Sequence, residues 1–136
     1  MNNRGVSIIE IIGVIILIGI IGIIAIPGVS KYILNARLTT YLAYEDSMED
    51  AAKNAVIDCI GKNSRSCDVP SKDEHVDVKL STLINEGFID EFTTPSGGSC
   101  DLDKSFVRII GRGNLNYKFK VCLRCDGYNT DDEMCE

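Results

Sequence analysis

The hydrophobic and polar positions divide this chain into two parts. From Ile11 to Ser30 there is no charged residue, and nearly every side chain is aliphatic or glycine. About 20 apolar residues span the core of a bilayer as an α-helix, whereas the apolar part of a secretory signal peptide covers about 7–15 residues. The pattern therefore predicts a membrane-spanning helix rather than a removable secretion signal.

Beyond Pro27 the apolar residues continue at helical spacing, and acidic residues occupy much of the opposite face. This predicts one long helix from Val6 to about Cys59 with an amphipathic second half. The alternative is two helices separated at Pro27, because proline removes a backbone hydrogen bond from a helix interior. The apolar positions of the second half are Leu34, Leu38, Tyr41, Met48, Ala52, Ala55 and Cys59.

The remainder of the chain predicts a small α+β region. A polar stretch over residues 61–73 indicates a loop, and Leu80, Leu83 and Ile84 indicate a short helix closed by Gly87. Residues 126–136 are acidic and indicate a loop held by Cys135.

Two segments alternate between apolar and polar residues, as half-buried strands do. These are residues 106–110 and 116–123, and the glycine-rich residues 111–114 between them indicate a turn. We expect an antiparallel hairpin whose apolar side is covered by the amphipathic half of the long helix. The predicted fold class is α+β: a long N-terminal helix, transmembrane in its first half, packed on a small antiparallel sheet.

Six cysteines lie between Cys59 and Cys135, and none lies in the apolar segment. An even number of cysteines in a small exported region favours disulfides. We expect Cys59 to pair with Cys67, and pairing among the other four stays open. Cys122 and Cys125 form a CxxC motif, so the alternatives are a redox-active pair or a zinc site. The other two possible zinc ligands would be Cys100 and Cys135.

The formal net charge is −6, which argues against a protein that coats nucleic acid with its whole surface. Even so, six basic residues occur in 21 residues that contain no acid. A basic side of the hairpin could bind DNA or another polyanion. The alternative is a contact with acidic residues of a neighbouring subunit's helix or of the chain's own helix. The six are Lys104, Arg108, Arg112, Lys118, Lys120 and Arg124.

No set of residues indicates an enzyme or a bound cofactor. His75 is the only histidine, so a Ser/His/Asp arrangement could be assembled only around this residue. We expect His75 to be a solvated loop residue. Three acids near the C-terminus, Asp126, Asp131 and Asp132, could hold calcium, but their spacing fits no strong calcium motif. We therefore predict no catalytic residue and no metal ligand.

The N-terminus carries a more specific motif. Arg4 and Gly5 precede Val6, and Glu10 lies within the apolar pattern, where a carboxylate is energetically costly. A short basic leader ending in glycine, a glutamate as the fifth mature residue and an apolar helix resemble the start of type IV prepilins and type II secretion pseudopilins. Members of this family usually begin the mature chain with an aromatic residue or Met, and Val6 departs from that pattern.

The resemblance implies a role for each of these residues. Gly5 would end a leader cut by a prepilin peptidase, and Val6 would become an N-methylated amino terminus. Glu10 would pair with the Val6 amine of a neighbouring subunit. Close packing of neighbouring helices would use small residues, and Pro27 would mark where the helix loosens. The small residues are Gly13, Gly19 and Gly22.

These implications give an expected organisation and function. Residues 1–5 would be the leader, 6–30 the transmembrane and assembly half of the helix, 31–59 its amphipathic half and 60–136 a disulfide-stapled globular region. The expected protein is a structural subunit of a pilus, secretion or competence filament, with a cytoplasmic N-terminus and an extracytoplasmic globular region before assembly. Alternatives are a minor pilin that binds a polyanion, and a single-pass membrane protein with a zinc or redox domain.

Overall fold

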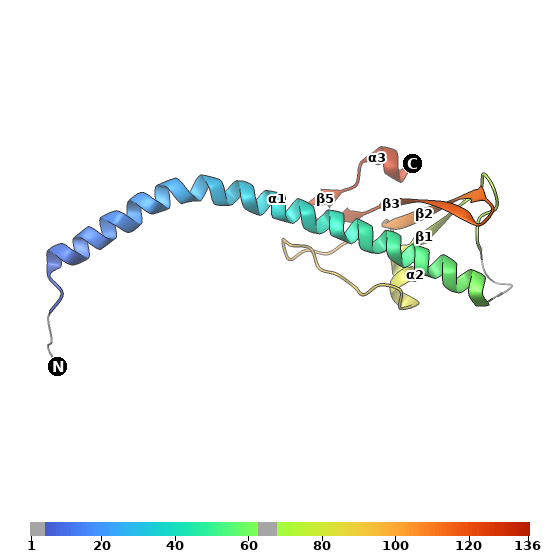
Figure 1. The fold of residues 1–136 in the computed structure, drawn as a ribbon, viewed down its shortest axis with the longest axis horizontal. Coiled ribbons are helices and arrows are strands. Elements are labelled where there is room, and N and C mark those ends of the chain that lie inside the picture. The colour runs from blue at the N-terminus through green and yellow to red at the C-terminus, as the bar shows by residue number, and fades with distance from the viewer. Residues whose placement is uncertain (1–4, 63–67) are drawn as a thin grey trace. The chain divides into compact units, whose positions relative to one another are not determined.

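The computed structural model describes residues 5–62 and 68–136 (Figure 1). Helix α1 comprises 55 residues, Ile8–Lys62, and passes through Pro27 without interruption. The prediction of one long helix is confirmed, and the alternative of two helices is wrong. In the turn after the proline, Ser30 Oγ donates a hydrogen bond to the carbonyl oxygen of Ile26 at 3.3 Å.

The chain divides into two compact units, residues 1–38 and 39–136. Within the first, the α1 segment Ile8–Ile26 has a mean hydropathy of 3.0 over 19 residues, and none of it is buried. A helix satisfies its own backbone hydrogen bonds, so it is one of the few structures that lipid tolerates. By length and composition this segment is a candidate membrane span.

In the second unit, three strands form an antiparallel sheet in the order β1-β2-β3. Strand β1 is His75–Lys79, β2 is Phe106–Gly113 and β3 is Asn116–Cys122. Val107 lies opposite Val121 and Ile109 lies opposite Phe119. Because side chains alternate between the faces of a strand, these four share one side of the sheet, which we call the inner face.

The predicted hairpin is confirmed, but its turn begins after Gly113, whereas we expected it over residues 111–114. Strand β2 continues to Gly113 through an irregular step after Gly111. The turn is formed by Asn114 and Leu115, both with positive φ, at 53° and 57°. Positive φ at both central residues is the geometry of a tight hairpin turn that matches the twist of its strands.

Strand β1 was not predicted. Its residues alternate in burial, but acidic neighbours at Asp73, Glu74 and Asp77 favoured a loop. The expectation that His75 is a loop residue is wrong, because it begins this strand. The acidic C-terminal stretch is also more ordered than expected, with the short pair β4 (Arg124–Cys125) and β5 (Tyr128–Asn129) followed by helix α3 (Asp132–Cys135).

The core of the second unit lies between the inner face and the amphipathic half of α1. Met48 and Ala52 of α1 are fully buried, as is Val107 of the sheet. The expectation that this helix covers the apolar side of the hairpin is confirmed. Leu34 and Leu38, which were assigned to the same stripe, are exposed, because the packed part of the helix begins near Tyr41.

Helix α2 (Leu80–Asn85) adds Leu80 and Leu83 to this core. It ends at Asn85, and the glycine predicted to close it, Gly87, follows with φ of 80°. The amide of Gly87 donates to the Ile84 carbonyl, and that of Phe88 donates to the Leu83 carbonyl. Glycine adopts this left-handed conformation without the steric cost that a Cβ brings.

A cluster of hydroxyl groups around Glu45 ties α1 to the C-terminal strand pair. Glu45 Oε1 accepts hydrogen bonds from Tyr128 Oη at 2.9 Å and from Thr130 Oγ1 at 2.5 Å. The Tyr128 ring also stacks on Tyr41, with ring centroids 4.6 Å apart. Burial, with the Glu45 carboxylate as a second cause, raises the pKa of the Tyr128 phenol from 10.0 to about 12.

We expect this cluster to make stability fall at high pH. The folded state favours the protonated phenol, so the contribution of Tyr128 is complete below its unfolded pKa of 10.0 and is lost as pH rises towards about 12. The melting temperature should therefore decline across that interval, and Tyr128→Phe should flatten the decline. The exposed Tyr32 provides the control, since Tyr32→Phe should leave the decline unchanged; an identical decline in both variants would contradict the assignment.

Candidate functional site

The residues expected to direct processing and assembly lie at the start of α1. Gly5 and Val6 precede the helix and are exposed, while Met1–Arg4 lie outside the described residues. Glu10 belongs to the first turn of the helix. Its amide donates to the Ser7 carbonyl at 2.9 Å. The partial positive charge at a helix N-terminus favours a carboxylate at this position.

The three glycines of Ile8–Ile26 do not share one face. A helix turns by about 100° per residue, so Gly19 and Gly22 lie about 60° apart, whereas Gly13 lies about 180° from Gly22. A Cβ added at any of the three would meet nothing within 4 Å. The segment therefore offers two separate places where another helix can approach closely.

Four of the six cysteines form two disulfides in the globular unit. Cys100 pairs with Cys125, and Cys122 pairs with Cys135. The two cysteines of the CxxC motif thus belong to different bonds and do not form a dithiol pair. With all four sulfurs oxidised, the zinc site proposed as an alternative has no thiolate ligands. Cys59 is also disulfide-bonded; its predicted partner Cys67 lies outside the described residues.

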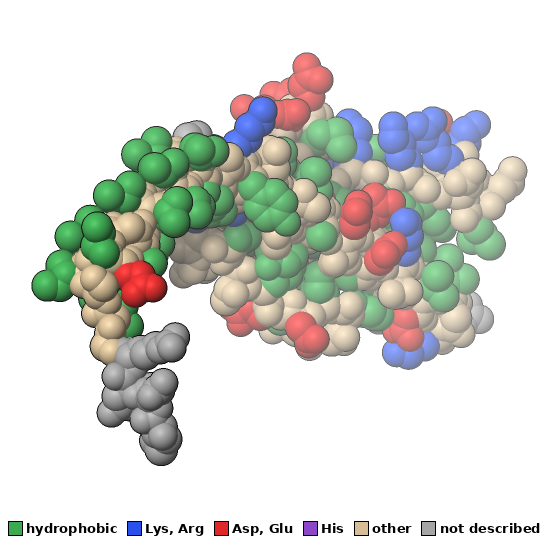
Figure 2. Space-filling model, turned by 60° about the vertical axis from the view of Figure 1, so that its left-hand side comes forward, with side chains coloured by type: hydrophobic (Ala, Val, Ile, Leu, Met, Phe, Trp, Pro, Cys, Tyr) green, Lys and Arg blue, Asp and Glu red, His purple; other side chains and the backbone are tan. Residues whose placement is uncertain are grey.

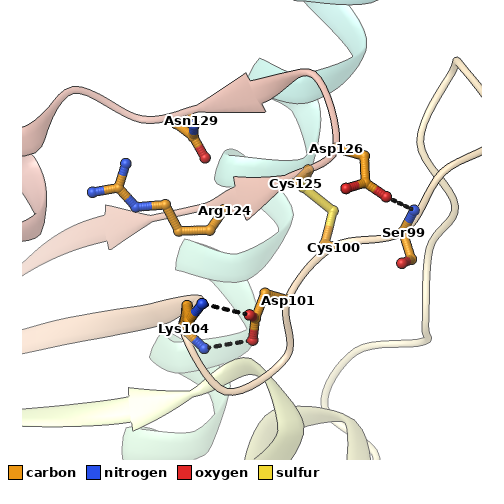
Figure 3. A pocket seen from close by; sticks show the side chains of 8 residues that line it. All are labelled: Ser99, Cys100, Asp101, Lys104, Arg124, Cys125, Asp126 and Asn129. Carbon is orange, nitrogen blue, oxygen red and sulfur yellow. Dashed lines mark hydrogen bonds and ion pairs between the residues drawn. A yellow bond between two sulfur atoms is a disulfide. The ribbon is translucent and has the colours of Figure 1, made fainter.

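An open pocket of about 500 Å³ surrounds the Cys100–Cys125 bond (Figure 3). The charged groups around it already have partners. Lys104 Nζ lies 3.5 Å from Asp101 Oδ2, and Asp126 Oδ2 accepts a hydrogen bond from the Ser99 amide at 3.1 Å. The pKa of Asp101 is lowered, chiefly because its carboxylate accepts a hydrogen bond from the Lys104 amide. The lining residues are Ser99, Cys100, Asp101, Lys104, Arg124, Cys125, Asp126 and Asn129.

The sulfurs and carboxylates of this pocket are engaged in bonds within the fold. Its two sulfurs are bonded to each other, and its carboxylates accept hydrogen bonds that hold the surrounding loop. Asp126 and Asp132, which we considered as calcium ligands, bond to Ser99 and to Arg124 respectively. Across residues 5–62 and 68–136, no three His, Cys, Asp or Glu side chains gather as a metal site would require.

The six basic residues of the acid-free segment fall into two groups of three. The first group is paired with acids. Arg124 Nη2 lies 2.7 Å from Asp132 Oδ1, Lys104 pairs with Asp101, and Arg108 binds Asp77 through Nε at 2.7 Å and Nη2 at 2.8 Å. Hydrogen bonding to Asp77 raises the pKa of Arg108. Arg108 also donates to the backbone oxygen of Glu136.

The second group comprises Arg112, Lys118 and Lys120, and within the described part of the chain none of them forms an ion pair. Lys118 and Lys120 alternate with the inner-face residues of β3, so they lie on the opposite side of the sheet. Figure 2 shows Lys and Arg side chains gathered along the upper right of the molecule. Arg112 lies at the irregular step of β2, close to the start of β3. We call these three residues the basic face.

His75 lies on the same side of the sheet as this basic face, opposite Ile110. It is exposed, and two of the acids near it in sequence have other partners. Asp77 binds Arg108, and Glu74 accepts a hydrogen bond from the Ser71 amide. The arrangement gives this histidine no base or metal-ligand partner among the residues described.

No protein-family model, curated protein or solved structure matches this chain.

Proposed function

We propose that this chain is a pilin-like structural subunit, cut after Gly5 and polymerised through the apolar half of α1 into a type IV pilus-like, secretion or competence filament. One observation carries the proposal. Glu10 places a carboxylate in the first turn of a helix whose apolar segment, Ile8–Ile26, is wholly exposed in the single chain. A helix that served only as an anchor would not need this carboxylate, which is costly to place in lipid.

A neighbouring subunit supplies the missing counter-charge in this proposal. Cleavage after Gly5 would create a new cationic amine at Val6, a residue that is exposed and lies outside the helix. Pairing that amine with Glu10 of another copy would offset the desolvation of both charges and set the register between the two helices. The carboxylate is thus an element of assembly rather than of catalysis.

The positions of the glycines support assembly with more than one neighbour. Gly19 and Gly22 share a side of the helix, and Gly13 lies opposite. Small residues allow helix backbones to approach closely in lipid. A subunit inside a helical array contacts neighbours on several sides, and this distribution suits such packing better than a single two-helix contact.

The disulfides support placing residues 39–136 outside the cytoplasm. Disulfides persist in oxidising compartments and are rare in the cytosol, and the globular unit contains the Cys100–Cys125 and Cys122–Cys135 bonds. In this proposal the N-terminus faces the cytoplasm, where a prepilin peptidase removes residues 1–5, and the globular unit is exported. Pro27 would then lie where the helix loosens during polymerisation.

The test is the exact N-terminus of the mature protein. Full-length protein is produced in membranes with an active prepilin peptidase, and its intact mass is compared with that of Gly5→Val. We expect the unaltered chain to begin at Val6 and to gain one methyl group, and the variant to keep residues 1–5. Bulk at the cleavage position should block the peptidase without changing the helix, because Gly5 precedes α1.

A Gly13→Val variant provides the control, since it changes a glycine inside α1 and should still be cut. If the unaltered chain retains residues 1–5 in the presence of a peptidase that cuts a known prepilin, the processing proposal fails. The protein would then be a membrane-anchored domain of a different kind.

A further inference from the structure

The basic face carries charge that the fold does not use. Arg112 and Lys118 are exposed and Lys120 is half-buried, and none of them pairs with an acid in the described segments. Lys120 also lies directly across from Arg108 on β2. Like charges opposite one another destabilise a sheet, and Asp77 compensates only Arg108. Lys120 therefore does not serve the stability of the hairpin.

The chain's own helix cannot neutralise this face. The amphipathic half of α1 packs against the inner face, whereas Lys118 and Lys120 lie on the other side of the sheet. For these two lysines, the alternative of a contact with acids of the chain's own long helix is therefore wrong.

The same helix on a second copy stays acidic. Lys53 Nζ lies 2.8 Å from Glu49 and 3.3 Å from Asp50, so this one base is shared by two acids, and Glu45 and Asp46 add further negative charge. A second copy is therefore the competing occupant of the basic face, and loss of self-association in the lysine variant would identify it.

The basic face has the spacing of a polymer-binding surface. Lys118 and Lys120 are two residues apart on one strand, which places them about 6.8 Å apart. Arg112 lies at the irregular step of β2 close to the hairpin turn. A row of cations spaced in this way can contact successive charges of a linear polyanion.

We propose that the basic face binds the phosphate backbone of duplex DNA. Sheets that bind single strands present exposed aromatic rings on which bases stack. Here Tyr117 and Phe119 lie on the inner face, and the Phe106 ring on the outer face has the Arg108 guanidinium 5.5 Å from its centroid. A surface of cations without stacking rings suits a duplex, whose bases are enclosed and whose phosphates point outward.

Binding through three phosphate contacts would be independent of DNA sequence and strongly dependent on salt. Each neutralised phosphate contributes about −0.9 to the slope of log K against log salt, so three contacts predict a slope of about −2.7. A fourfold rise in salt would then weaken binding roughly 40-fold. The net charge of −6 opposes binding elsewhere on the surface, which confines the contact to this face.

The test uses full-length protein in neutral detergent micelles and a fluorescently labelled DNA duplex, with anisotropy measured over a range of salt. We expect Lys118→Gln with Lys120→Gln to reduce the slope to about −0.9, so that the same fourfold rise in salt weakens binding only roughly 3- to 4-fold. The matched control is Lys62→Gln with Lys104→Gln, which removes the same charge from residues paired with Asp58 and Asp101. Thermal unfolding of both double variants verifies that each is folded.

Several results would overturn the proposal. These are no binding at low salt, equal losses in the two double variants, and tighter binding to the single strand than to the duplex. Loss of self-association instead of DNA binding in the Lys118/Lys120 variant would identify a second copy of the chain as the occupant. The measurement is made on single subunits, so its outcome does not depend on whether the chain forms filaments.

Discussion

Glu10→Gln is expected to abolish filament assembly while the protein still inserts into the membrane. The variant keeps the shape of the side chain but leaves the Val6 amine of the neighbouring subunit without a counter-charge. Removing one member of a buried pair is strongly destabilising, because the other charge remains desolvated and unpaired. We expect the filament fraction sheared from cells to fall by roughly two orders of magnitude, with the membrane-bound pool unchanged.

Glu49→Gln is the matched control, because it neutralises a carboxylate on the same helix. Glu49 lies in the globular unit and pairs with Lys53 at 2.8 Å, with 38% of the Glu49 side chain and 43% of the Lys53 side chain exposed. An exposed pair of this kind contributes little to stability, so this variant should form filaments normally. Filaments of Glu10→Gln at the unaltered level, with the N-terminus correctly cut, would show that the carboxylate has no part in assembly.

Gly111→Ala is expected to unfold the globular unit or to destabilise it severely. A Cβ at this position would lie 2.0 Å from the backbone oxygen of Ser71 and 2.7 Å from that of Pro70. The Gly111 amide donates to the Glu74 carbonyl, and its own carbonyl accepts from the Asp73 amide. These two hydrogen bonds hold the segment of residues 70–74 against β2. The segment therefore cannot move away, and an added Cβ would clash with its backbone atoms.

We expect a loss of about 3 kcal/mol or more, at the upper end for overpacking a closed site, and a fall in melting temperature on the order of 15 °C. The melting temperature is measured by thermal unfolding of the full-length protein in detergent, with near-ultraviolet circular dichroism as the signal. The control is Gly61→Ala, where an added Cβ meets nothing within 4 Å and alanine favours the helix. Equal melting temperatures in the two variants would mean that the chain at Ser71 does not lie against this strand.

Much of the fold follows from patterns local to the sequence. The alternation of Tyr117, Phe119 and Val121 predicts both a strand and the side of it that is buried. Leu80, Leu83 and Gly87 predict a short helix and its end. In each case neighbouring residues carry the physical cause, either a repeat of apolar positions or a glycine that tolerates positive φ.

Strand β1 was not predicted because acidic residues in and before it are more typical of a loop than of a paired strand. His75-Val76-Asp77-Val78-Lys79 alternates as a strand does, but the acidic residues that precede and interrupt it favoured a loop. The strand forms because it pairs with β2 along its whole length, with Asp77 opposite Arg108. Such pairing depends on residues about 30 positions away in the chain, and no local pattern reports it.

The candidate sites divide in the same way. Sequence by itself determined the motif at Gly5 and Glu10, the apolar segment behind it and the concentration of basic residues, because charge and hydrophobicity belong to each residue wherever it lies. Only the tertiary structure decided which of the six basic residues are neutralised and which form the basic face. It also decided that Cys122 and Cys125 belong to different disulfides. Both outcomes depend on which distant groups the sheet brings within bonding distance, since an ion pair or a disulfide is a property of two positions.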